Sequence, residues 1–220
     1  NPLLVTGRTG KGEPDGVAPD MARAIAEALG FDIELVAFAS PGEVSDALMG
    51  DSWDIAFIGA EPARAKTIAF SPAYVEIEAT YLVRDGSPFS NVGDVDRAGV
   101  RIAVSERSAY DLFLERSLEH AELVRGKGLA GALKQFVDGE LEALAGLRPA
   151  LSENARKLAG MRVVDGGFTT VKQAIGCKPK NAATAAFLKS FVEEARRSGL
   201  VARLIERHGV EGKLQVASGD

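Results

Sequence analysis

Strand-like apolar runs alternate with amphipathic helical patterns along this chain, and the alternation starts again after a cluster of breaker residues at 84–88. In the first half, strand-like and helical runs follow one another at residues 3–7, 21–29, 31–36, 41–49 and 54–58. Strands that alternate with helices are typical of a parallel sheet with helices on its faces. The chain is therefore predicted to be an α/β protein with two similar units.

The second half repeats the pattern less regularly. Strands are predicted at 99–104, 141–145 and 162–164, and helices at 129–137 and from Ser108 and Ser152. Ser108 and Asp111 have the spacing of a helix capping box. Two amphipathic helices end the chain, and the pattern does not determine where they pack.

Composition argues against several classes of function. The net charge of −5 disfavours nucleic acid or an anionic membrane as a partner. The single cysteine, Cys177, excludes an internal disulfide, and two histidines leave little for a metal site. No paired nucleophile and histidine and no phosphate-binding glycine motif are present. We therefore expect no cofactor, no bound metal and no catalytic residue.

The most informative segment for function runs from Asp54 to Tyr74. It places Arg64 in a polar turn between an apolar strand and the run Ile68–Tyr74. An arginine just beyond a buried strand can offer a planar fork of donors to a carboxylate, which a lysine cannot match. By itself, Arg64 would be interpreted as a surface residue in a loop. Its role therefore has to be judged from the other motifs of the chain.

Other segments accompany this one in a fixed order. They are Asp15-Gly16 with Pro19-Asp20-Met21-Ala22, then Asp46 to Asp54, then Arg64 with Phe70-Ser71-Pro72-Ala73-Tyr74, then Gly99 to Ser108, and finally Ala195 to Val210. Together they resemble the periplasmic solute-binding proteins that serve ABC transporters for polar amino acids and related small acids (family 3, type II fold). The resemblance covers nearly the whole chain. Its most specific part is the placement of Arg64 six residues before Phe70.

The resemblance implies a two-lobed α/β fold, each lobe a mainly parallel sheet flanked by helices, with two hinge crossovers. Lobe 1 would hold residues 1–84 and 171–220, and lobe 2 residues 85–170. Closure of the lobes would bury a small ligand. The implied protein is a periplasmic monomer that presents its ligand to the membrane permease of an ABC importer. No signal peptide precedes Asn1, and we interpret the sequence as a trimmed mature form.

The same resemblance assigns roles to individual residues. Arg64 is expected to clamp a carboxylate of the ligand, beside the backbone of Gly59 and Ala60. From lobe 2, the turn from Ser105 to Ser108 leads into a helix N-terminus, whose free N–H groups and positive dipole end suit an anion. For Ser108, a plain N-cap role remains open.

The sequence departs from the amino-acid binders at one position. Where those proteins supply an aspartate for the ligand's ammonium group, this chain has Leu147 followed by Arg148. An apolar residue cannot neutralise a buried ammonium, and a second arginine would repel it. Arg148 is therefore expected either to clamp a second anion, which favours a dicarboxylate or another polar organic acid, or to be a solvated residue at a helix start.

Tyr74 and Glu78 fall on one face of the strand that follows Pro72, and both are expected to contact the ligand. Glu78 could hold a cationic group or pair with an arginine, which would restore an amine-bearing ligand.

Two other functions remain open. One is a lyase or dehydratase on the same fold, with Glu78 or Glu142 as general acid. The other is the ligand-sensing domain of a receptor.

Overall fold

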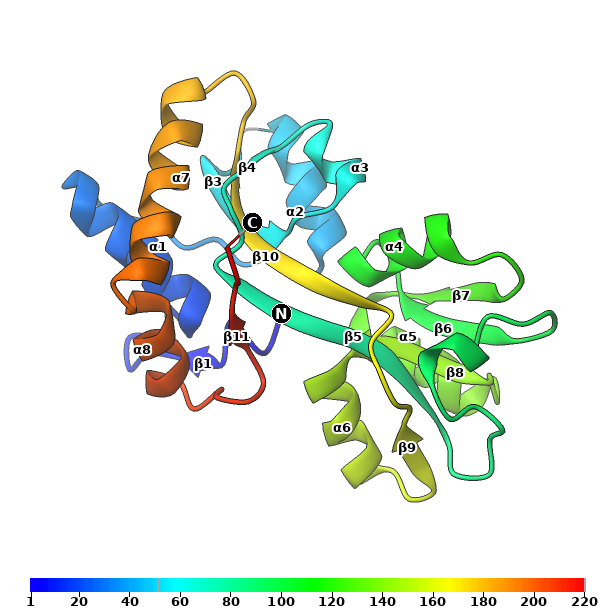
Figure 1. The fold of residues 1–220 in the computed structure, drawn as a ribbon. Helices are drawn as coiled ribbons and strands as arrows, with labels where there is room; N and C mark the ends of the chain where they lie inside the picture. Colours follow the sequence, from blue (N-terminus) through cyan, green and yellow to red (C-terminus); the bar gives the residue numbers. More distant parts are fainter. Residues whose placement is uncertain (51, 220) are drawn as a thin grey trace. The chain divides into compact units, whose positions relative to one another are not determined.

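The computed structural model describes residues 1–50 and 52–219, so Asp51 of the motif from Asp46 to Asp54 lies outside the described residues. The chain divides into two compact units, which we describe separately. Unit 1 contains residues 1–39, 43–76 and 172–220, and unit 2 contains residues 40–42 and 77–171. Two strands, β5 (Val75–Arg84) and β10 (Thr169–Cys177), run from one unit into the other (Figure 1). The first division comes after Glu76, earlier than the expected position after Arg84, and the second comes after Val171.

Unit 1 is built from short strands and longer helices. They are β1 (Gly7–Arg8), β2 (Pro14–Asp15), α1 (Val17–Leu29), α2 (Pro41–Ala47), β3 (Ile55–Gly59), α3 (Pro62–Ala65), β4 (Ala69–Phe70), α7 (Ala182–Arg197), α8 (Leu200–Arg207) and β11 (Gln215–Val216). Both β3 and β4 pair antiparallel with β10, and β11 pairs antiparallel with the start of β5. Helix α8 packs against α1 and α7. The C-terminal helices thus belong to the same unit as the N-terminal helix, which the sequence pattern did not determine.

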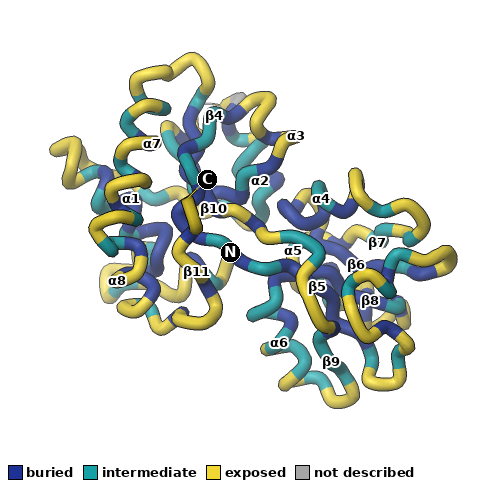
Figure 2. Tube along the Cα trace, viewed as in Figure 1, coloured by how far each residue is buried: buried dark blue, intermediate teal, exposed yellow. Residues whose placement is uncertain are grey.

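Unit 2 holds a mixed sheet covered by helices. Its elements are β6 (Arg101–Ser105), α4 (Ala109–Ser117), β7 (Glu122–Gly126), α5 (Gly128–Asp138), β8 (Ala143–Leu147), α6 (Arg148–Lys157) and β9 (Met161–Val163). Strand β6 pairs parallel with β7 and β8, whereas β5 pairs antiparallel with β8 and β9. Strands β6 and β8 are almost wholly buried (Figure 2). The α/β class is therefore confirmed, with mixed strand directions where mainly parallel sheets were expected.

Each unit has its own apolar core. In unit 1, Trp53 packs with Leu48, Ala56 and Ile68, and its indole N–H donates to the carbonyl of Val44 at 2.8 Å. In unit 2, α5 supplies Phe136, which packs among leucines of the neighbouring strands and helices. Burying such side chains contributes about 25 cal/mol per Å² of apolar surface. No helix in the described part of the chain is long and apolar enough to cross a membrane.

Helix ends follow the local sequence. Gly30 ends α1 in the left-handed conformation (φ 68°), as the glycine after the predicted helix indicates. Ser108 is the N-cap of α4, and its hydroxyl oxygen accepts the N–H of Asp111 at 3.0 Å. The N-cap at Ser108 is confirmed because a cap depends on residues within one turn of the chain. The reciprocal bond of a capping box is not formed, because the Asp111 carboxylate accepts the N–H of Arg107 and not that of Ser108.

One predicted strand is wrong, and another is formed only at its last residue. Residues 2–4 form a turn, in which the N–H groups of Leu4 and Val5 both donate to the carbonyl of Asn1 at 3.0 Å, and only Gly7 of the predicted strand at 3–7 lies in a strand, the two-residue β1. Residues 31–36 form neither helix nor strand, and Phe31 is 70% exposed. Alternation of apolar residues describes which face would be buried, but a strand also needs a neighbour that supplies its hydrogen bonds. No described strand pairs with residues 31–36, and the first segment pairs only at its end, where Gly7 lies opposite Asp15 of β2 and the Thr6 N–H donates to the Asp15 carbonyl at 2.9 Å.

Candidate functional site

Arg64 lies where the polypeptide leaves β3 of unit 1. Strand β3 ends at Gly59, and Pro62 starts the short helix α3 that carries Arg64. The side chain is almost completely enclosed, since the residue is 5% exposed. One guanidinium nitrogen, Nη1, donates to the carbonyl of Gly59 at 2.6 Å. This bond fixes the cation at the end of the strand, because a buried charge must keep hydrogen-bond partners.

The backbone of Gly59 and Ala60 is already engaged by the protein. The Gly59 carbonyl accepts the bond from Arg64, and the Ala60 N–H donates to the carbonyl of Lys172 at 2.8 Å. Unit 1 thus brings Arg64, Gly59 and Ala60 together as expected from the sequence. A direct contact of the two backbone groups with a ligand stays a prediction.

Tyr74 is a fully buried residue of unit 1. Its ring meets Phe57 edge to face, with 5.8 Å between centroids and 80° between ring planes. Burial raises the pKa of Tyr74 well above its ordinary value, so the hydroxyl is protonated at neutral pH. That hydroxyl has no hydrogen-bond partner within residues 1–50 and 52–219. The geometry gives Tyr74 a packing role, and its contact with a ligand stays a prediction.

Replacing Tyr74 by phenylalanine is expected to stabilise the protein by about 1 kcal/mol, because a buried hydroxyl without a partner is removed while the packing stays the same. Thermal unfolding of the two proteins measures the difference. The predicted contact of the Tyr74 hydroxyl with the ligand is tested separately, and unchanged ligand affinity in the variant would rule it out. A tenfold loss of affinity would instead assign Tyr74 to the binding site.

The turn from Ser105 to Ser108 connects β6 to α4 in unit 2. Both serines are buried, and the Ser108 N–H donates to the Ser105 carbonyl at 3.1 Å. Between them, Arg107 adopts a left-handed conformation (φ 56°), which a residue with a side chain seldom does. Its N–H donates to a carboxylate oxygen of Asp111 at 2.7 Å, which supports the strained turn. The N-cap role of Ser108 is confirmed.

Glu78 and Arg148 are brought together in unit 2. Arg148 follows Leu147, the residue of β8 that pairs with Ala79 of β5. Its Nε atom donates to the Glu78 carboxylate, and its Nη2 atom donates to the carbonyl of Gly166 at 2.7 Å. Glu78 therefore neutralises the charge that was expected to clamp a second anion. Both side chains remain partly exposed, and their contact with a ligand stays a prediction.

Glu142, the other acid considered for catalysis, is held by Arg101. The guanidinium donates to both oxygens of its carboxylate, at 3.0 Å from Nε and 2.8 Å from Nη2. This pairing keeps the pKa of Glu142 below its ordinary value. A general acid at neutral pH needs a raised pKa. The arrangement therefore does not suit Glu142 to proton donation.

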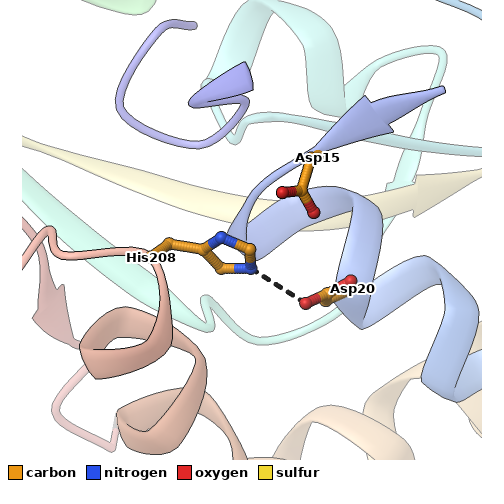
Figure 3. Close-up of side chains that lie close together, drawn as sticks. All are labelled: Asp15, Asp20 and His208. Atoms are coloured by element: carbon orange, nitrogen blue, oxygen red, sulfur yellow. Dashed lines mark hydrogen bonds and ion pairs between the residues drawn. The ribbon is translucent and has the colours of Figure 1, made fainter. Parts of the chain in front are cut away.

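Unit 1 contains a cluster of Asp15, Asp20 and His208 that no sequence motif indicated (Figure 3). One potential metal-ligand atom from each residue lies within 4.8 Å of the others. However, Asp20 already accepts hydrogen bonds from His208 at 2.8 Å and from Arg23 at 2.9 Å. A metal ion would compete with these donors and be repelled by the arginine. We interpret the cluster as an ion-pair network that joins α1 to the end of α8.

This network predicts a loss of stability in acid. Burial raises the pKa of Asp20, but hydrogen bonds from His208 and Arg23 outweigh burial and hold the pKa below its ordinary value. Because the folded-state pKa is lowered, the stabilisation is complete above about pH 4 and is lost as the pH falls through the folded-state pKa. Asp20→Asn should cost about 1 kcal/mol near neutral pH and progressively less below about pH 4. Thermal midpoints of the parent and of Asp20→Asn, measured across this pH range, test the prediction. A difference between the two midpoints that does not depend on pH would contradict the lowered pKa of Asp20.

Solved structures share this fold at low sequence identity. A histidine kinase sensor domain with similarity to periplasmic binding proteins has a TM-score of 0.78 at 20% identity, over 95% of this chain and 91% of that one. An amino acid ABC transporter substrate-binding protein from Streptococcus pneumoniae, bound to L-arginine, gives 0.76 at 18%, over 94% and 89%. An ancestral amino-acid-binding protein, described as a precursor of cyclohexadienyl dehydratase, gives 0.72 at 23%, over 91% and 88%. At these identities the likeness shows the fold alone.

Comparison of the sequence with family profiles identifies the family of the chain, which the fold alone does not. No curated protein sequence matches the chain. The profile of one family does match, and it covers residues 5–211, which include Arg64, the turn at Ser105–Ser108 and the pair formed by Glu78 and Arg148. The chain belongs to the bacterial extracellular solute-binding proteins, family 3.

Proposed function

We propose that this protein is the solute-binding component of an ABC importer and that it captures a small carboxylate-containing solute in the periplasm. Family membership supports solute binding. One observation carries the choice of a carboxylate: the almost fully buried guanidinium of Arg64, anchored on the Gly59 carbonyl. A guanidinium fork matches a carboxylate in shape and charge.

The energetics are consistent with this role. A hydrogen bond to a charged group contributes about 1.5–3 kcal/mol. A micromolar complex requires about 8 kcal/mol in total. Arg64 can therefore supply a large share of the binding free energy, with the remainder coming from other groups of the protein.

The pair formed by Glu78 and Arg148 bears on the chemistry of the rest of the ligand. Leu147 offers nothing to an ammonium group, and Arg148 is neutralised by Glu78. A ligand acid could replace Glu78 on Arg148, whereas a ligand amine could replace Arg148 on Glu78. We favour a polar organic acid, because Arg148 has a second anchor on the Gly166 carbonyl, which would hold the cation in place if Glu78 were displaced.

Ligand identification tests the proposal. Mass spectrometry of protein purified without refolding should detect a co-purified acid. A thermal-shift panel of amino acids, dicarboxylates and other organic acids should then rank candidates, because a ligand at 100 times its Kd stabilises the folded state by about 2.7 kcal/mol. The proposal fails if neutral or purely cationic compounds alone raise the midpoint. A largest shift from an ordinary amino acid would overturn the preference for an organic acid.

A dehydratase is a weaker candidate, motivated by the described precursor of cyclohexadienyl dehydratase. It needs a carboxylic acid that donates a proton near neutral pH. Glu78 and Glu142 are both paired with arginines, so neither is arranged for that task. Turnover of a candidate acid, followed by NMR of the mixture, would favour the enzyme.

A further inference from the structure

The side chain of Glu78 lies directly against the backbone of Gly167, in a space that exists because this residue has no side chain. A Cβ atom at Gly167 would be 2.5 Å from Cγ of Glu78 and 2.6 Å from its Oε1 atom. Unbonded carbon atoms pack at about 3.5–4.0 Å, so Glu78 would have to move aside. Glycine at position 167 therefore seats Glu78 where its carboxylate accepts the bond from Nε of Arg148.

The backbone on which Glu78 rests is held in place from both sides. Just after Gly167, the N–H of Phe168 donates to the carbonyl of Ala79 at 3.0 Å. Just before it, the Gly166 carbonyl accepts the hydroxyl of Thr80 at 2.8 Å, and Thr80 is completely buried. Both acceptor and donor on this side belong to β5, the strand that carries Glu78. The seat is therefore a fixed part of unit 2.

Arg148 has a support that does not depend on Glu78. Its Nη2 atom donates to the Gly166 carbonyl at 2.7 Å, the same carbonyl that Thr80 holds. The side chains of Arg148 and Glu78 are 32% and 42% exposed, so small solutes reach the pair. An ion pair this exposed contributes little stability. Glu78 can therefore leave the guanidinium at little cost, while Arg148 stays where it is.

We propose that Glu78 is a built-in competitor for Arg148: seated by Gly167, it occupies the guanidinium until a carboxylate of the ligand replaces it. The inference rests on the proposed function, in which the ligand is an acid. A guanidinium pairs with a carboxylate through two parallel N–H bonds, so a ligand acid needs the Nε atom that Glu78 takes. Glu78 thus lowers the affinity of this end of unit 2 for an acid. It is a specificity-determining residue, and Gly167 is the residue that positions it.

Acetate, which offers a carboxylate and little else, is the probe, and acetamide is its neutral counterpart. The Nε–H signal of Arg148, identified by its loss in Arg148→Lys, is followed by ¹⁵N NMR of the full chain at constant ionic strength. In Glu78→Gln, the Kd for acetate at this signal should be about tenfold lower than in the parent, because a charged competitor for one hydrogen bond is gone. Acetamide should not move the signal saturably. Asp138→Asn, which removes the acid of an exposed ion pair with Lys134 in α5, should bind acetate like the parent.

A second variant separates the position of Glu78 from its charge. Gly167→Ala keeps the carboxylate but fills its seat, and the new Cβ meets only a flexible side chain, so the thermal midpoint should stay near that of the parent. The Kd for acetate should fall, but by less than in Glu78→Gln, because the negative charge stays nearby. Gly86→Ala, in open space of the same unit, should change nothing. Adding Gly167→Ala to Glu78→Gln should bring no further gain, because both changes remove one contact.

Three results would each overturn the inference. They are an equal Kd for acetate in the parent and Glu78→Gln, a gain of the same size in Asp138→Asn, and equal shifts with acetamide. If the proposed function itself is wrong, no acid stabilises the parent protein. If only the inference is wrong, acids stabilise the parent, but acetate binding at Arg148 does not depend on Glu78.

Discussion

Replacing Arg64 by alanine is expected to weaken binding of the co-purified acid at least about 100-fold, because two hydrogen bonds to a charged group are lost at about 1.5–3 kcal/mol each. Part of the loss comes from preorganisation. The bond from Nη1 to the Gly59 carbonyl holds the guanidinium before the ligand arrives, so little side-chain entropy is lost on binding. Isothermal titration of parent and variant with the same acid measures the effect.

Two further variants separate charge from geometry. Arg64→Lys keeps the positive charge but loses the planar fork, so its affinity should fall between those of the parent and Arg64→Ala. Arg203→Ala removes an exposed arginine of unit 1 that donates to the Ser198 carbonyl at 2.8 Å, and it should bind like the parent. Circular dichroism checks that each variant is folded. Equal affinity of Arg64→Ala and the parent would remove the carboxylate clamp from the proposal.

The parts of the fold that the sequence predicts well are set by short stretches of chain. The end of α1 at Gly30 and the start of α4 at Ser108 depend on backbone hydrogen bonds within one helical turn, so nearby residues suffice to place them. Strand β10 was missed. It pairs with β3 and β4, which lie more than a hundred residues earlier in the chain. Pairing at that separation depends on the whole unit.

The candidate site divides in the same way. Arg64 could be predicted as a candidate ligand-binding residue, because the prediction rests on the segment around it and on the resemblance carried by Phe70-Ser71-Pro72. The bond between Arg148 and Glu78 joins residues 70 positions apart, and the pair formed by Asp20 and His208 joins residues 188 apart. The sequence suggested that Glu78 could pair with an arginine, but it did not identify Arg148 as the partner, and nothing in it indicated the pair formed by Asp20 and His208. Sequence therefore indicated which residues carry charge, and the fold determined which charges are already neutralised.

Gly126 links the core of unit 2 to the turn before α4, and Gly126→Ala is expected to destabilise the protein by about 3 kcal/mol. A Cβ atom there would lie 2.4 Å from the backbone nitrogen of Ala132 and from the carbonyl carbon of Gly131, both in α5, so strand or helix would have to move. The Gly126 carbonyl also accepts the N–H of Glu106 at 2.9 Å, which anchors the turn before α4.

Gly128→Ala is the matched control for this clash. Gly128 has a left-handed φ of 64° but open space around it, so alanine there should cost only about 1 kcal/mol of conformational strain. For a protein of this size, the thermal midpoint should fall by about 6–12 °C for Gly126→Ala and about 2–4 °C for Gly128→Ala. Equal midpoints for the two variants would show that α5 yields easily and that Gly126 does not hold the turn in place.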